Sequence, residues 1–150
     1  TLYGLAFTST FTGSNVSVTG NTIRSVGFGS SSGSAVSSNT GINGACNLQY
    51  SQFAAESNTI EIIPSTATFT RPVNSVVGIS APYVATSYAT PSVISVKNNN
   101  VTVAYATSAY GVGAYTSSWS AANASCTIEG NTITVTCPTS MSSASYGACA

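Results

Sequence analysis

The chain has 150 residues, which suits one domain, and its 43% of hydrophobic residues can form a core. Only 4% of the residues are charged, with three cations, three anions and no histidine, whereas globular proteins average about 25%. A net charge of zero without a basic cluster excludes nucleic acid as a partner. No apolar run reaches the roughly 18 residues of a membrane span. Because no signal-peptide pattern opens the chain, we expect a mature, processed protein.

The first predicted element covers residues 2–12. Its large apolar side chains alternate with small ones, and only Ser9 breaks the series of Tyr3, Leu5, Phe7 and Phe11. An alternation of two predicts a strand with one buried face. An apolar terminus needs a groove to fill, and this groove can belong to its own domain or to a neighbouring copy.

The rest of the chain reads as short strands separated by turn residues, without helical periodicity. A turn at residues 12–15 follows the first strand, and residues 29–44 are a long loop or weak strands. The other strands are expected near residues 16–18, 22–28, 48–53, 59–63, 67–70, 75–79, 93–96, 101–105, 126–128 and 133–137. The last four form two expected hairpins. We therefore predict an all-β, Greek-key sandwich of immunoglobulin-like or pilin-like type over residues 13–150.

One short motif recurs in the sequence. It is Gly-Asn-Thr-Ile at residues 20–23 and 130–133, and Ser-Asn-Thr-Ile at residues 57–60. A β-helix would repeat such a turn at a regular period, but the spacings are 37 and 73. We interpret the motif as turn residues that precede a β-branched strand.

The four cysteines are Cys46, Cys126, Cys137 and Cys149. An even count without a Cys-x-x-Cys pair or a histidine favours disulfides over a metal site, and hence an oxidising compartment or a hyperthermophilic host. Three pairings are possible. In the expected hairpin Cys126 and Cys137 are diagonal, roughly 7–8 Å apart, which favours bonds from these two to Cys46 and Cys149.

Catalytic chemistry lacks its usual residues. The chain has no histidine, no aspartate and only three glutamates, and no phosphate-binding loop or serine-nucleophile motif is present. We predict neither an enzyme nor a metal or cofactor site. The single lysine, Lys97, precedes three asparagines, which raises an isopeptide bond as a hypothesis beside that of a solvated turn lysine.

Three sequons, at Asn15, Asn100 and Asn123, predict N-linked glycans that would supply the solvation that charge does not. Tyrosines 83, 88, 105, 110 and 115 could stack on sugars. A monomeric, secreted carbohydrate-binding module, a lectin or adhesin, is therefore the alternative to a structural role.

Together, the apolar first strand with Tyr3, Leu5, Phe7 and Phe11, the Gly-Ser-Asn joint after it, the scarcity of charge, the sequons and the cysteines resemble archaeal surface filament subunits of the thread or bundling-pilus type. The long apolar N-terminal helix of type IV pilins is absent. The resemblance implies that residues 1–12 are a donor strand that completes the sheet of the next copy. It further implies a helical homopolymer at the cell surface that supports adhesion or biofilm formation.

Overall fold

The computed structural model describes residues 2–28, 38–64, 73–84, 92–104, 106–113, 124–136 and 144–149. These residues form sixteen strands. They contain no helix, and hence none long and apolar enough to cross a membrane. The prediction of an all-β protein is confirmed.

The strands follow one another as successive coils of a solenoid. The first coil consists of β1 (Leu2–Ala6), β2 (Thr10–Thr12), β3 (Asn15–Thr19) and β4 (Thr22–Phe28). The second consists of β5 (Asn39–Asn43), β6 (Asn47–Gln49), β7 (Gln52–Glu56) and β8 (Thr59–Pro64). The third consists of β9 (Val73–Ser80), β10 (Tyr83–Val84), β11 (Ser92–Lys97) and β12 (Asn100–Ala104). The fourth has β13 (Ala106–Gly113), β14 (Ala124–Glu129) and β15 (Thr132–Thr136), and β16 (Ala144–Cys149) begins a fifth.

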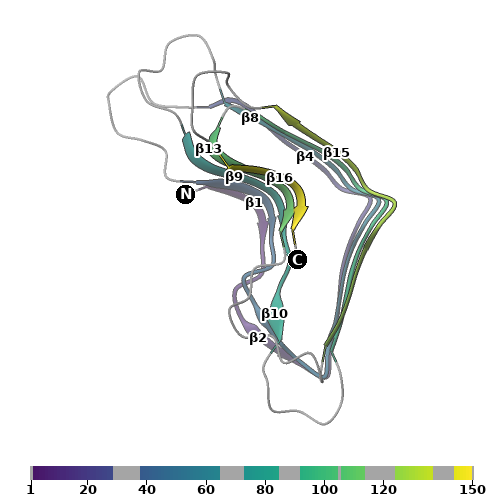
Figure 1. Ribbon diagram of the computed structural model, residues 1–150. Helices are drawn as coiled ribbons and strands as arrows, with labels where there is room; N and C mark the ends of the chain where they lie inside the picture. The colour runs from purple at the N-terminus through teal and green to yellow at the C-terminus, as the bar shows by residue number, and fades with distance from the viewer. Residues whose placement is uncertain are drawn as a thin grey trace.

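Each of the first three coils gives one strand to each wall of the solenoid, and the described strands of the fourth coil lie in sheets A, C and D. Sheet A has the order β1-β5-β9-β13-β16, sheet B β10-β6-β2, sheet C β14-β11-β7-β3 and sheet D β15-β12-β8-β4. Every pairing between described strands is parallel. Figure 1 shows equivalent strands lying side by side along the walls, with a sharp corner where sheet C meets sheet D. This arrangement is a parallel β-helix.

The predicted Greek-key sandwich is therefore wrong. A Greek key requires antiparallel neighbours joined by hairpins, but the two expected hairpins are corners. The turn at residues 98–99 carries the chain from β11 in sheet C to β12 in sheet D, and the turn at residues 130–131 does the same for β14 and β15. Each strand consequently pairs with its equivalent in the next coil rather than with its sequence neighbour.

The recurring motif marks this corner. Its asparagines, Asn21, Asn58 and Asn131, are joined by a fourth, Asn99, and equivalent positions in successive coils are 37, 41 and 32 residues apart. The spacing of 73 thus spans two coils of unequal length. The motif does consist of turn residues that precede a strand, since β4, β8 and β15 begin at its threonine. The argument against a β-helix was wrong, because the third coil has Asn-Asn-Asn-Val at residues 98–101 and hides the repeat.

The core is a column of apolar side chains inside the coils. Its largest fully buried members are Phe53, Ile42, Leu48, Ile60, Ile62, Ile79, Ile94, Val76, Val96, Val101, Val103 and Val112. Sheet A approaches sheet D so closely that the facing residue of sheet A must be glycine. A Cβ on Gly41 would lie 2.6 Å from both Ile60 Cγ2 and the carbonyl oxygen of Gly78.

The predicted N-terminal strand is two strands of the first coil. β1 pairs with β5 in sheet A, and β2 pairs with β6 in sheet B. Residues 7–9 form the corner between them, which is where Ser9 breaks the alternation. The predicted boundary at residue 12 between a donor strand and a separate domain is thus not present, because residues 2–12 belong to their own solenoid.

Candidate functional site

Four asparagines stack into a ladder at the corner between sheets C and D. The Oδ1 atom of each asparagine after the first accepts the backbone N–H of the ladder asparagine in the preceding coil. This distance is 2.9 Å for Asn58 Oδ1 from Asn21, for Asn99 Oδ1 from Asn58 and for Asn131 Oδ1 from Asn99. The same oxygen also accepts the Nδ2 group of the preceding asparagine, at 2.9–3.0 Å. The ladder therefore joins each coil to the next by two bonds at one atom.

A third bond fixes the amide group of each ladder asparagine after the first. Nδ2 of Asn58 donates to the carbonyl oxygen of Val18 at 2.8 Å, and Asn99 and Asn131 repeat this bond to the equivalent carbonyls of the preceding coils. The residue before each ladder asparagine has a φ between 55° and 68°. This left-handed position, which glycine and asparagine adopt most easily, turns the chain at the corner. Its occupants are Gly20, Ser57, Asn98 and Gly130.

The ladder has a direction, and its two ends are chemically different. In the part of the chain that the structure describes, no donor reaches Asn21 Oδ1, and no acceptor receives the backbone N–H of Asn131. Among these described residues, the ladder therefore ends in an unbonded acceptor at the first coil and in an unbonded backbone donor at the fourth coil.

The first coil forms an open end of the solenoid. Among the described strands, β1, β2, β3 and β4 have one neighbour each, so their outer backbone groups are unpaired. The four residues predicted as donor-strand plugs all lie here. Leu5, Phe7 and Phe11 are half-buried against the core, and the Phe7 ring lies edge-on to Phe53, with 6.0 Å between ring centroids. Tyr3, in contrast, is 50% exposed.

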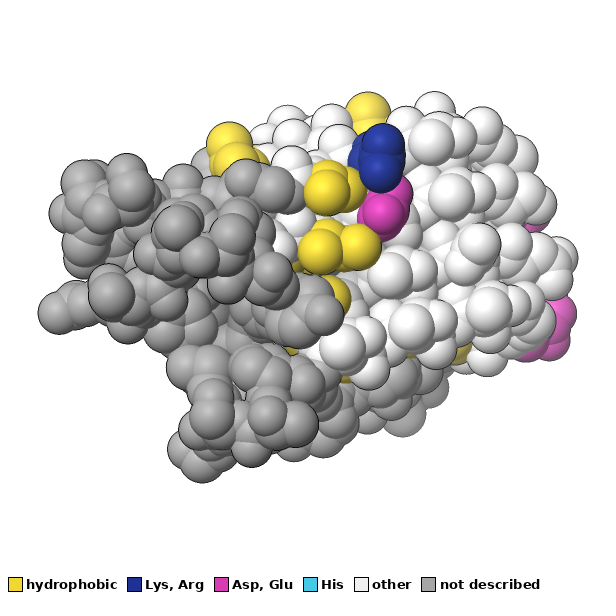
Figure 2. Space-filling model, turned by 90° about the horizontal axis from the view of Figure 1, so that it is seen from above, with side chains coloured by type: hydrophobic (Ala, Val, Ile, Leu, Met, Phe, Trp, Pro, Cys, Tyr) yellow, Lys and Arg dark blue, Asp and Glu magenta, His cyan; other side chains and the backbone are white. Residues whose placement is uncertain are grey.

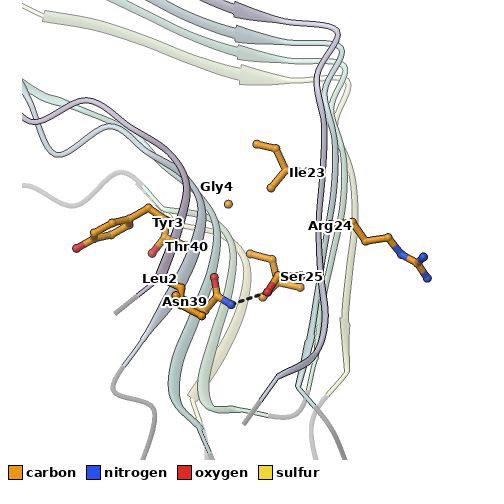
Figure 3. Close-up of a pocket in the computed structure, with 10 residues that line it drawn as sticks. Leu2, Tyr3, Gly4, Ile23, Arg24, Ser25, Asn39 and Thr40 are labelled. Carbon is orange, nitrogen blue, oxygen red and sulfur yellow. Dashed lines mark hydrogen bonds between the residues drawn. The ribbon is translucent and has the colours of Figure 1, made fainter.

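A cavity of about 230 Å³ opens at this end between sheets A and D. Figure 3 shows Gly4 facing Ile23 across it, with the Tyr3 ring and the Arg24 side chain pointing away. Below them, Asn39 Nδ2 donates to Ser25 Oγ at 2.9 Å and links the two sheets. The cavity is small and lies beside a strand with a single neighbour, so it is a feature of the open end rather than an enclosed ligand site.

The opposite end is formed by β14 and β15, each with one neighbour among the described strands. Its inward-facing apolar residues are half-buried, as at the first coil: Cys126, Ile128, Ile133 and Val135. In sheet A the solenoid continues one strand further, because β16 lies beside β13. The two ends thus present similar edges of strands over a partly covered core.

The few charged side chains bridge neighbouring coils on the outer surface. Arg24 Nε lies 2.6 Å from Glu61 Oε2, and Lys97 Nζ lies 2.7 Å from Glu129 Oε1. This contact with Glu129 raises the pKa of Lys97. Figure 2 shows a basic side chain beside an acidic one on a face that is otherwise mostly uncharged. The Lys97 ammonium is thus an ion-pair partner on the surface, and the isopeptide bond stays a hypothesis.

The disulfide pairing stays a prediction, because only two of the four cysteine side chains are described. Cys46 is a free thiol in the core, and Cys126 is a free, half-buried thiol of β14. Burial raises the pKa of Cys46 to about 11 and also raises that of Cys126. The diagonal-hairpin argument failed because residues 126–128 and 133–135 lie in different sheets. Cys137 and the side chain of Cys149 lie outside the described residues.

The sequons and tyrosines are only partly described. Asn15 and Asn100 are exposed first residues of β3 and β12, whereas Asn123 lies outside the described residues. Of the five tyrosines named for sugar binding, only Tyr110 has a described side chain, and it is half-buried. Glycosylation and sugar binding stay predictions. No group of three or more potential metal ligands occurs within the described residues.

Sequence reasoning missed the ladder and the glycine column, which together define the coils. Both left a signal. The ladder asparagines are the second residues of the recurring motif, and glycines 4, 41, 78, 111 and 147 follow one another at spacings of 37, 37, 33 and 36. Two superimposed repeats of nearly the same period indicate a solenoid.

Comparison with known proteins gives no relative: no family model, no curated protein and no solved structure matches the chain.

Proposed function

We propose that this chain is a structural subunit of an extracellular filament in which copies stack end to end along the solenoid axis. The observation that carries the proposal is the polarity of the asparagine ladder. The first coil offers the free acceptor of Asn21, and the fourth coil offers the free donor of Asn131. Because the two surfaces differ, the contact is head-to-tail and propagates instead of closing as a dimer.

The register of the strands supports this stacking. Continuing sheets C and D by one strand sets β14 beside β3 of the next copy, and β15 beside β4. By the pairing already present within the chain, Ile128 then aligns with Val18. Ile133 likewise aligns with Ile23. The contact would cover the half-buried side chains of Ile23, Ile128 and Ile133, at about 25 cal/mol per Å² of apolar surface removed from water.

The same alignment avoids repulsion between like charges. Glu129, the acidic residue at the last coil of sheet C, aligns with Thr19 of the next copy. Arg24 of the next copy aligns with Thr134. Strand edges that would otherwise be unpaired find partners on both sides of the contact.

The ladder would also continue through the contact. Asn131 would donate its backbone N–H and Nδ2 to Asn21 Oδ1 of the next copy, and Asn21 Nδ2 would donate to the carbonyl of Ile128. This replaces donor-strand insertion into a sandwich groove as the route of assembly. Glycans on the exposed residues Asn15 and Asn100 would stand on the outer surface of such a filament, in keeping with a cell-surface location and a role in adhesion or biofilm formation.

The experiment uses two variants that block opposite ends. Ile23→Lys places a charge on the first coil, and Ile133→Lys places one on the last coil of sheet D. We expect the wild-type chain to form filaments that are visible by electron microscopy. Their fibre diffraction should show the roughly 4.7–4.9 Å repeat of strands stacked along the axis. Val93→Lys is the matched control and should still form filaments, because Val93 is exposed on the outer face of the third coil.

Each end-blocking variant alone should remain monomeric by light scattering. An equimolar mixture should give heterodimers, since the unblocked end of each variant fits that of the other. The heterodimer also shows that both variants fold. A wild-type chain that stays monomeric at high concentration, or a mixture that yields no dimer while wild type assembles, contradicts end-to-end stacking.

A further inference from the structure

The stacking proposed above creates a conflict in sheet A. Sheets C and D have four strands each, but sheet A has five, because β16 lies beyond β13. When β3 and β4 of the next copy continue sheets C and D, β1 of that copy belongs directly beside β13. That position is already taken by β16. Two strands therefore compete for one place in the sheet.

The two competing strands carry the same local sequence in the same register. Tyr3 aligns with Tyr110 through β5 and β9, and Tyr146 pairs with Tyr110 directly. β1 thus reads Tyr-Gly-Leu and β16 reads Tyr-Gly-Ala over equivalent positions. Either strand presents its tyrosine and its glycine at the same points.

The strand that lies beside β5 must have a glycine at the position of Gly4. A Cβ on Gly4 would lie 2.5 Å from Ile23 Cγ2 and 2.6 Å from the carbonyl oxygen of Gly41. Only a strand with glycine there can lie beside β5 without moving the backbone. In β16 this residue is Gly147, so β16 meets the steric requirement that the first coil sets.

β1 is held weakly in its own chain. Leu2 and Tyr3 are about half exposed, and the cavity of about 230 Å³ lies directly beside the strand. The strand has one neighbour and is followed by a corner whose residue Phe7 makes a single backbone bond, to the carbonyl of Asn43 at 2.8 Å. Replacing β1 therefore costs the half-buried packing of Leu5 but no fully buried side chain.

We propose that β16 of one copy takes the place of β1 in the next copy and pairs with its β5, while residues 2–6 of that copy leave sheet A. The inference rests on the proposed end-to-end assembly and names the strand that connects the copies. The sequence predicted an N-terminal donor strand. Here the C-terminal strand β16 is the donor, and the N-terminal strand β1 leaves the sheet.

Two double-cysteine variants, made with all four native cysteines changed to serine, show whether β16 or β1 occupies sheet A at the contact between copies. Thr40→Cys with Tyr146→Cys joins β5 and β16, which are three strands apart within one chain but adjacent across the proposed contact. Tyr3→Cys with Tyr110→Cys joins β1 and β13 of successive copies in the same way. Adjacent strands lie roughly 4.7–4.9 Å apart, within the Cα range of a disulfide.

We expect oxidised filaments of the first variant to give a ladder of covalent multimers on a non-reducing gel, and those of the second to give monomers. Multimers from the second variant alone, or filaments in which neither variant cross-links, overturn the inference and leave end-to-end assembly in place. Failure of every variant and of the wild type to form filaments refutes the proposed function instead.

A lock on β1 gives an independent test. Tyr3→Cys with Thr40→Cys, in the same background, pairs register partners within one chain. Once oxidised, this variant should stay monomeric, and reduction should restore filaments. Filaments that form equally well with the lock closed would show that β1 does not leave.

Discussion

The ladder predicts that an interior asparagine contributes far more to the free energy of unfolding than the asparagine at its end. Asn58 is 1% exposed, and its side chain makes four hydrogen bonds. Its Oδ1 accepts the backbone N–H and the Nδ2 of Asn21, at 2.9 and 3.0 Å. Its Nδ2 donates to the carbonyl of Val18 at 2.8 Å and to Asn99 Oδ1 at 2.9 Å. Asn58→Ala removes all four bonds and supplies no new partner for the groups that made them.

The cost follows from these bonds. A typical hydrogen bond contributes about 1 kcal/mol net, and a buried group left without a partner costs about 1–3 kcal/mol. Asn21 is half-buried at the end of the ladder, where water can reach its amide, whereas Val18 is only 3% exposed and its carbonyl would be left without a partner. We therefore expect Asn58→Ala to lower the free energy of unfolding by about 3–5 kcal/mol, a large part of the roughly 5–15 kcal/mol typical of a domain.

Asn21→Ala is the matched control. It removes the same side chain from the end of the ladder, where Nδ2 donates to the Thr19 carbonyl at 3.3 Å and to Asn58 Oδ1 at 3.0 Å. Asn58 Oδ1 keeps the backbone N–H of residue 21, so the expected cost is about 1 kcal/mol. Urea unfolding at a concentration where the chain is monomeric measures both. Equal losses in the two variants would refute the idea that the ladder holds the coils together.

Two further predictions concern the core. Gly41→Ala should lower the free energy of unfolding, measured in urea, by about 3 kcal/mol, because its Cβ would press on a carbonyl oxygen and on Ile60. Gly20→Ala, where φ is 68° and the space is open, should lower it by only about 1 kcal/mol. The reverse order would contradict the close approach of sheets A and D. The buried Cys46 thiol has its pKa raised from 9.0 to about 11, so the unfolded chain ionises first and stability should fall by at most about 1.4 kcal/mol per pH unit between pH 9 and 11. Cys46→Ala should lose this decline, and an unchanged pH dependence of unfolding would argue against a buried thiol.

The sequence was sufficient for the class of fold but not for its connectivity. Alternation in stretches such as residues 59–63 predicts strands whether their neighbours are parallel or antiparallel, because the side-chain period is two in both cases. The turn at Gly130–Asn131 is equally compatible with a hairpin and with a corner of a solenoid. A left-handed residue is required by both, so the local signal cannot choose between them.

The site was hidden for a related reason. The ladder depends on one side chain per coil, and the coils differ in length, so the asparagines recur at unequal intervals. In the third coil Asn98 replaces the glycine or serine of the motif, since asparagine also tolerates a positive φ. The alternation in the first dozen residues predicts strands but not their partners, which are β5 and β6 of the same chain.

The end of the ladder gives a prediction that links stability to assembly. In the proposed stack Asn21 Oδ1 accepts two bonds from Asn131 of the preceding copy, and Asn21 Nδ2 donates to a carbonyl there. Asn21→Ala removes these three contacts while costing the monomer little, so the contact between copies should weaken by about 3 kcal/mol. The concentration at which filaments form, measured by sedimentation, should then rise about 100-fold. A variant that unfolds like the wild type and also assembles at the wild-type concentration would show that the ladder does not cross the contact.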